Sequence, residues 1–126
     1  MTRSEVAAWG EAEAARYLRR IGWEILATNW HCRYGEIDLI ARDGPTLVFV
    51  EVKTRRSRSF GRPEEAITPG KLRRLARAIW TYVEQQGAPE TEWRMDVIAI
   101  EGRPGGSPLR LDHYPDALPG DEDWTT

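Results

Sequence analysis

Residues 35–53 combine two strand patterns, a tight turn and charged side chains that a purely structural hairpin does not need. Residues 36–41 and 46–52 are rich in the aliphatic and β-branched side chains that favour strands. The sequence Asp-Gly-Pro lies between them at 43–45. Because Gly tolerates positive φ and Pro ends a strand ladder, these residues predict a tight turn. The stretch therefore predicts an antiparallel β-hairpin.

Three charged side chains stand on the two predicted strands. Side chains alternate along a strand, so Glu51 and Lys53 project from one face, and Val50 and Val52 from the other. Asp38 lies on the facing strand, and the turn folds that strand back towards Glu51. We therefore expect two carboxylates and one ammonium to converge at one edge of the sheet.

These residue types suit phosphodiester chemistry. Carboxylates are hard oxygen ligands for Mg²⁺ or Mn²⁺, and Mg²⁺ needs only one or two of them beside a phosphate. The metal would activate a water, and Lys53 would hold that water or the developing oxyanion. Lys at this position is informative, because only two of the 18 basic residues are Lys. The alternative interpretation is a solvated Glu-x-Lys pair that contributes little.

The sequences GEID at 35–38 and VEVKTR at 50–55 resemble the uncharacterised YraN-type family of the restriction-endonuclease-like PD-(D/E)xK nuclease superfamily. Archaeal Holliday-junction resolvases are relatives in that superfamily. The likeness extends from about Glu11 to Ile100, with Ile37 where the superfamily pattern has Pro. It implies a metal-dependent phosphodiesterase core with Asp38, Glu51 and Lys53 as catalytic residues. It also implies branched or junction DNA as substrate, and a possible two-fold homodimer.

A first helix is expected over residues 4–21, with Ser4 as N-cap and Gly22 just beyond its end. Its apolar stripe recurs every three or four residues and consists of Val6, Gly10, Ala14, Tyr17, Leu18 and Ile21. Glu11 lies beside this stripe, whereas Glu5 and Glu13 are expected to point elsewhere. A carboxylate at the edge of a core needs a partner, either a metal or an Arg. The resemblance implies the metal, because a first-helix Glu joins the metal cluster there.

A basic block follows the predicted site. The formal net charge is −2, yet residues 53–77 carry nine cations and only two carboxylates. Distribution matters more than the sum for nucleic-acid binding, so we expect phosphate contacts here, although a solvated face is the alternative. The expected contacts are Arg55, Arg56, Arg58, Lys71, Arg73 and Arg74. Trp30 and Tyr34 could stack on bases, but aromatic residues near strand ends are more typical of a core.

The clearest helix prediction begins at Pro69 with Thr68 as N-cap and ends before Gly87. Its apolar stripe is Leu72, Leu75, Ala76, Ile79, Trp80 and Val83. Cations near its start oppose the helix macrodipole, so helix stability does not explain them. The segment before it, residues 54–63, has no periodicity and is expected to form a basic loop over the site.

Further strands are expected at 23–30, 93–100 and 109–114, with Asp96 pairing with Arg94 or a loop amide. The order α-β-β-β-α-β-(β) predicts an α/β fold with a mixed central sheet flanked by helices. We expect one nuclease-like domain over 1–114 and a disordered acidic tail over 115–126.

Composition excludes several other classes. No apolar run is long enough to span a membrane, and residues 1–10 have no signal-peptide pattern, so we expect a cytoplasmic protein. One Cys cannot form an internal disulfide or a Cys-rich zinc site. The leading hypothesis is a Mg²⁺- or Mn²⁺-dependent DNA endonuclease with Glu11, Asp38 and Glu51 as metal ligands. The second is a non-catalytic nucleic-acid-binding or assembly module that retains the fold.

Overall fold

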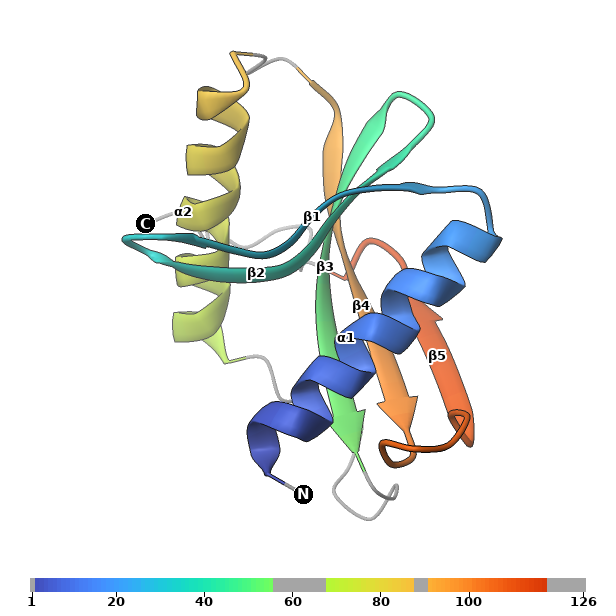
Figure 1. The fold of residues 1–126 in the computed structure, drawn as a ribbon. Helices are drawn as coiled ribbons and strands as arrows, with labels where there is room; N and C mark the ends of the chain where they lie inside the picture. Colours follow the sequence, from blue (N-terminus) through green and yellow to red (C-terminus); the bar gives the residue numbers. More distant parts are fainter. Residues whose placement is uncertain (1, 56–67, 88–90, 118–126) are drawn as a thin grey trace.

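The computed structural model describes residues 2–55, 68–87 and 91–117 (Figure 1). Its elements are α1 (Arg3–Arg20), β1 (Glu24–Cys32), β2 (Gly35–Asp43), β3 (Thr46–Arg55), α2 (Pro69–Gln85), β4 (Trp93–Glu101) and β5 (Arg110–Tyr114). The five strands form one sheet in sequence order. Neighbouring strands are antiparallel except β3 and β4, which are parallel and are connected through α2. The predicted element order and the mixed α/β sheet are confirmed.

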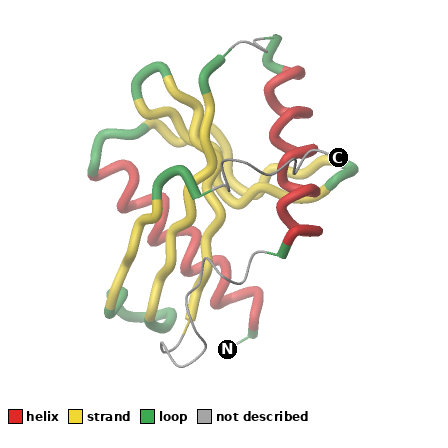
Figure 2. Tube along the Cα trace, turned by 180° about the vertical axis from the view of Figure 1, so that it is seen from behind, coloured by secondary structure: helices red, strands yellow, loops and turns green. Residues whose placement is uncertain are grey.

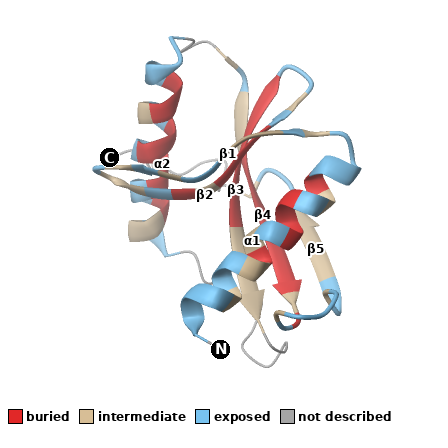
Figure 3. Cartoon of the chain, viewed as in Figure 1, coloured by how far each residue is buried: buried red, intermediate tan, exposed pale blue. Residues whose placement is uncertain are grey.

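The two helices pack on opposite faces of the sheet. Alternation along β3 directs Val48 and Val50 into the core beneath α1, and Leu47 and Phe49 into the core beneath α2. Figure 1 shows α1 in front of the sheet, and in Figure 2, seen from behind, the strands pass in front of it. Burial is continuous through the centre of β3 and β4 (Figure 3). The central strands therefore form a rigid platform between two helices.

The β2–β3 hairpin has the predicted turn. Asp43 pairs with Thr46, and Gly44, with φ +57°, leads into Pro45 in the two-residue connection. The left-handed φ explains the Gly at this position. The ladder runs on to Leu39 opposite Val50. This register places Asp38 opposite Glu51, as the sequence predicted.

Helix α1 begins earlier than expected. Thr2 is the N-cap, and its hydroxyl accepts the backbone N–H of Glu5 at 3.1 Å, so the predicted Ser4 cap is wrong. At the other end Gly22, with φ +93°, follows the helix, and Trp23 N donates to Leu18 O at 3.0 Å. This hydrogen bond completes a Schellman motif and turns the chain into β1.

Two expected side-chain orientations on α1 are wrong. Glu13 is buried, although we expected it to point away, and it pairs with Arg16 at 3.5 Å. Ile21, expected in the apolar stripe, is 46% exposed because the helix ends there. Ala15 instead extends the buried stripe of α1, and it packs in the same core cluster as Ala14 and Leu18.

Helix α2 follows its prediction closely. Thr68 caps it by accepting the N–H of Lys71 at 3.2 Å, Pro69 is its first residue, and Gly87 lies beyond its C-cap. Trp80 is the exception, since it is 39% exposed and lies edge-on to Trp93, while Ala78 and Tyr82 are buried instead.

Most of the remaining boundaries differ by one or two residues from those expected, but β3 continues three residues past Val52, so Thr54 and Arg55 belong to the strand and not to the expected loop. β1 continues to Cys32, so the turn before β2 is shorter than expected and consists of Arg33 and Tyr34. After β5 the chain still contacts β4, because Ala117 N donates to Met95 O at 2.7 Å. The rest of the predicted acidic tail, and most of the predicted basic loop, lie outside the described residues. Neither described helix is apolar enough to be a candidate membrane span.

Candidate metal and nucleic-acid site

Asp38 and Glu51 face each other where the β2–β3 ladder ends. One residue beyond the last pair, Asp38 Oδ2 accepts the backbone N–H of Val52 at 2.9 Å. The carboxylate thereby takes the place of a backbone acceptor, which fixes its orientation on β2. Glu51 is almost fully buried on the α2 side of β3. The structure thus brings together the two carboxylates that the sequence predicted.

Two ammonium groups reach the same oxygen of Glu51. Lys53 Nζ lies 3.4 Å from Glu51 Oε1, as its position on the same face of β3 predicts. Lys71 Nζ lies 2.6 Å from that oxygen and comes from the first turn of α2. We had expected Lys71 to contact phosphate only. Lys71 and Glu51 are 20 residues apart in the sequence, so no local pattern predicted this contact.

The cluster shifts the pKa values of Asp38, Lys53 and Lys71. Burial and the facing Glu51 carboxylate raise the pKa of Asp38 to about 7, although the Val52 N–H and Lys71 act in the opposite direction. Burial and the nearby Lys71 lower the pKa of Lys53. Burial also opposes the charge on Lys71, but the Glu51 carboxylate outweighs it and raises the pKa of Lys71. Asp38 therefore lacks the positive charge needed to hold it ionised, which suits a site for an added cation.

Glu11 approaches this cluster from α1. Gly10 permits the approach, because a Cβ at that position would overlap the Thr54 side chain on β3. Burial raises the pKa of Glu11, a hydrogen bond with Asn29 lowers it, and the charges of Glu36 and Glu51 raise it further. Glu11 is thus within electrostatic range of Glu51.

The three carboxylates do not form a closed cage. Across residues 2–55, 68–87 and 91–117, no three Asp, Glu, His or Cys side chains lie close enough to hold one ion. Asp38 and Glu51 remain a sufficient pair for Mg²⁺ or Mn²⁺, since such ions keep several waters. The donor set therefore fits a hard divalent ion, with Glu11 further out than the resemblance implies.

A pocket of about 240 Å³ opens onto the two carboxylates. Gly35, Glu36 and Asp38 line it from β2, Glu51 from β3, and Lys71, Arg74 and Leu75 from α2. One wall is acidic and the other is basic. A phosphate could enter with its charge facing α2 while its reacting oxygen faces the carboxylates.

The predicted basic surface continues along α2. A shallow hollow of about 180 Å³ is lined by Gly70, Arg73, Arg74 and Arg77. The guanidinium carbon of Arg77 also lies 5.9 Å from the centre of the Tyr34 ring. The sequence prediction of Arg73 and Arg74 as neighbours on one surface agrees with this arrangement, and Arg77 joins them.

The other predicted contacts are placed less clearly. Arg56 and Arg58 lie outside the described residues. Arg55 ends β3, and its Nε is buried without a hydrogen-bond partner in the described part of the chain. Trp30 packs in the core edge-on to Tyr82, as we favoured, whereas Tyr34 lies beneath the guanidinium of Arg33.

Sequence reasoning missed a second basic surface between α1 and β1. A groove of about 650 Å³ runs beside Glu11 and is bordered by Arg16, Arg19 and Arg20. Ala8, Ala12 and Ala15 form its helical wall, so small side chains leave room for it. Arg19 and Arg20 lie in the last turn of α1, where cations stabilise a helix through its macrodipole. Helix stability therefore explained them, and no sequence pattern indicated a binding surface there.

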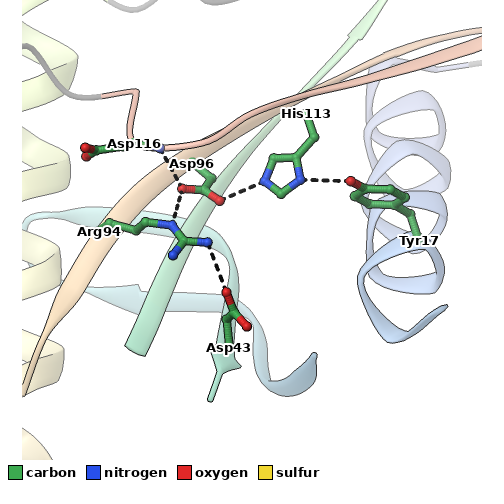
Figure 4. A network of polar contacts seen from close by, with 6 residues as sticks. All are labelled: Tyr17, Asp43, Arg94, Asp96, His113 and Asp116. Atoms are coloured by element: carbon green, nitrogen blue, oxygen red, sulfur yellow. Dashed lines mark hydrogen bonds and ion pairs between the residues drawn. The ribbon is translucent and has the colours of Figure 1, made fainter. Parts of the chain in front are cut away.

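A separate polar network ties α1 to β4 and β5 (Figure 4). Buried Asp96 accepts from Arg94 Nε at 3.0 Å and contacts His113 Nε2 at 2.7 Å, which confirms the expected pairing with Arg94. His113 Nδ1 lies 2.9 Å from the Tyr17 hydroxyl. Burial opposes the charge of Asp96, but its hydrogen bonds keep its pKa low. Every group is paired within the protein, so the network is structural.

The fold and the cluster define an α/β protein with two carboxylates and two lysines where the β2–β3 ladder ends, beside an arginine-lined helix. Residues 10–100 match the model described as "Uncharacterised protein family UPF0102". The UPF0102 protein of Nocardia farcinica is 48% identical over 111 residues, covering 88% of this chain and 87% of that one. The UPF0102 protein of Herpetosiphon aurantiacus is 43% identical over 119 residues, covering 89% and 92%. The chain belongs to the UPF0102 family.

Proposed function

We propose that this protein is a Mg²⁺- or Mn²⁺-dependent endonuclease with a restriction-endonuclease-like PD-(D/E)xK core. The observation that carries the proposal is the facing pair Asp38 and Glu51 with Lys53 beside it, all on adjacent rigid strands. The raised pKa of Asp38 supports it, because a purely structural carboxylate would gain nothing from this repulsion.

Each residue has a distinct role in the proposed reaction. Asp38 and Glu51 would hold the ion, which when bound supplies an activated water and neutralises charge on the phosphate. Lys53 lies at the same carboxylate and would orient the attacking water or stabilise the developing oxyanion. A partly buried Lys with a lowered pKa suits proton sharing better than Arg. Glu11 would orient water from further out.

The proposed substrate is DNA, positioned by the basic side of the pocket. Arg74 lines both the carboxylate pocket and the arginine hollow, so one phosphate backbone could pass from Arg73 and Arg77 to the ion. Such contacts position a backbone without reading sequence. Branched or junction DNA, cut by a two-fold homodimer, is the substrate form that the family resemblance suggests.

A cleavage panel tests this function. Linear duplex, flap, single-stranded and four-way DNA are incubated with Mn²⁺ and wild-type protein, Asp38→Ala or Lys53→Ala. Wild type should cut at least one substrate, EDTA should stop it, and both variants should lose the activity. Equal cutting by all three proteins would mean that the nuclease arises from a contaminant or from another site.

The second candidate function is a non-catalytic nucleic-acid-binding module with the same fold. It is favoured by the ion pair of Glu51 with Lys71 and Lys53, which already balances one carboxylate within the chain. Calorimetry separates the two candidates. A nuclease should bind Mn²⁺ in a manner that Asp38→Ala abolishes, whereas the binding module should retain DNA binding and show no Mn²⁺ heat.

A further inference from the structure

Lys71 occupies a position that helix stability does not explain. It lies in the first turn of α2, where the macrodipole disfavours a cation. Its backbone N–H is fixed by the Thr68 cap at 3.2 Å, so the start of its side chain is held in place. From there the side chain crosses the pocket to Glu51 on β3. The Glu51 carboxylate therefore accounts for the location of this ammonium.

The contact is shorter than that of the catalytic Lys candidate. Lys71 Nζ lies 2.6 Å from Glu51 Oε1, against 3.4 Å for Lys53 Nζ. Glu51 also belongs to the carboxylate pair that would hold the proposed ion, and its negative charge is already paired with this ammonium. The Glu51 side chain is 7% exposed and that of Lys71 is 31% exposed. The carboxylate is thus held in the protein, while the ammonium can reach solvent.

We propose that Lys71 is a resident counter-ion of the carboxylate pair. A divalent metal displaces its ammonium from Glu51, and the displaced ammonium then binds the substrate phosphate. The inference rests on the proposed function, because it takes Asp38 and Glu51 to be the ligands. An ammonium on a flexible four-carbon stem can leave Glu51 without movement of the α2 backbone. Its pocket also contains Arg74, so the released Lys71 remains at the phosphate side. Metal and nucleic acid should consequently bind cooperatively.

Calorimetric titration with Mn²⁺ tests the displacement. Lys71→Met removes the charge and keeps an unbranched side chain, so it should bind Mn²⁺ roughly tenfold more tightly than wild type, since the shorter of the two Glu51 ion pairs no longer has to be broken. Lys71→Arg should bind no more tightly than wild type. Arg74→Met is the matched charge control, because Arg74 lines the same pocket but makes no ion pair with either carboxylate among the described residues. High salt should reduce the effect of Arg74→Met on Mn²⁺ affinity and preserve the effect of Lys71→Met.

The outcomes separate the inference from the function on which it rests. If wild type binds Mn²⁺ and Lys71→Met binds it equally or more weakly, Lys71 is not a displaced counter-ion, and the nuclease proposal stands. If neither protein binds Mn²⁺, the metal site itself is wrong, and the inference falls with it. Lys71→Gln provides the same comparison should the Met variant lack the wild-type melting temperature.

A second titration tests the phosphate contact. In the Lys53→Met background, which lacks the proposed catalytic ammonium, a saturating linear DNA duplex should tighten Mn²⁺ binding. By linkage, Mn²⁺ should tighten DNA binding by the same factor. Adding Lys71→Met should remove most of this coupling. Coupling of equal size with and without Lys71 would show that the released ammonium does not bind the phosphate.

Discussion

Asp38 on β2 and Glu51 on β3 lie opposite each other, one residue beyond the last backbone pair of their ladder. The hairpin register alone produces this arrangement, since it is fixed by a two-residue turn and by a buried face that permits no slip. Two like charges in a partly buried site oppose each other's ionisation. The protein tolerates the arrangement, and its consequences for pH, catalysis and metal binding can be measured.

Asp38→Asn should stabilise the metal-free protein in a pH-dependent manner. The pKa of Asp38 rises from 3.8 to about 7 on folding, so the native state binds the extra proton between these values and loses stability as pH increases through them. Near pH 4 the variant and wild type should melt at similar temperatures, and the difference should widen as pH rises towards 7. At pH 8 the variant should melt higher, by roughly 5 °C or more.

The measurement is a thermal melt in EDTA across pH 4 to 8. Asn can still accept the Val52 N–H, so the substitution removes charge and keeps the hydrogen bond. A melting difference that is constant with pH would show that Asp38 is not titrating in this range. A variant destabilised at every pH would make Asp38 a structural acceptor only.

Lys53→Ala should impair turnover and leave metal binding in place. In the proposed reaction Lys53 neutralises transition-state charge but contributes no ligand atom, so cleavage should fall by at least about 10²-fold while Mn²⁺ still binds. Single-turnover cleavage and Mn²⁺ calorimetry on the same preparation check both parts. Loss of Mn²⁺ binding together with activity would indicate that Lys53 holds Glu51 in position instead.

Arg73→Ala with Arg74→Ala should weaken DNA binding uniformly across sequences. Each lost phosphate contact reduces the salt slope of log K by about one unit, so the double variant should show a flatter salt dependence. Fluorescence anisotropy over a range of salt concentrations measures this slope. The matched control is Arg19→Ala with Arg20→Ala in the α1–β1 groove, which changes net charge equally. Identical losses of DNA affinity in both double variants would show that the overall charge, and not the α2 surface, causes the effect.

Gly10→Ala should destabilise the protein even though Ala favours a helix by about 1 kcal/mol over Gly. The added Cβ would overlap the Thr54 hydroxyl, and forcing the two apart costs about 1–3 kcal/mol. Urea unfolding measures the net loss. Thr54→Ala in the same chain should recover stability, and a double-mutant cycle gives the coupling. If the two substitutions changed the free energy of unfolding additively, the cause of the Gly10→Ala loss would lie elsewhere in α1 and not in contact with Thr54.

Local patterns predicted most of the architecture. The α2 cap at Thr68, the turn at Gly44 and the pairing of Asp38 with Glu51 each depend on residues close in sequence, where period and turn chemistry are decisive. The first residue of helix α1 was harder to predict, because Thr2 and Ser4 are both good N-cap residues. Its burial was also misjudged at Glu13, where the angle at which α1 crosses the sheet decides which side chains are covered.

What the sequence could not predict depends on contacts between distant elements. Lys71 reaches Glu51 only because α2 packs on the face of the sheet that carries Glu51. His113 joins Asp96 and Tyr17 only because β5 folds back beside β4. A lone His in a short, polar strand carries no local signal of such a network. Tertiary placement, which no periodicity encodes, supplied both contacts.

The central claim is that Asp38 and Glu51 form a site for a divalent cation, and a metal-dependent melt of wild type and Asp38→Asn tests it most directly. A ligand that binds only the native state raises the melting temperature with its concentration. Millimolar Mn²⁺ should raise the melting temperature of wild type relative to EDTA and leave that of Asp38→Asn unchanged. A Mn²⁺ shift of equal size in both proteins, or no shift in wild type, would contradict the account.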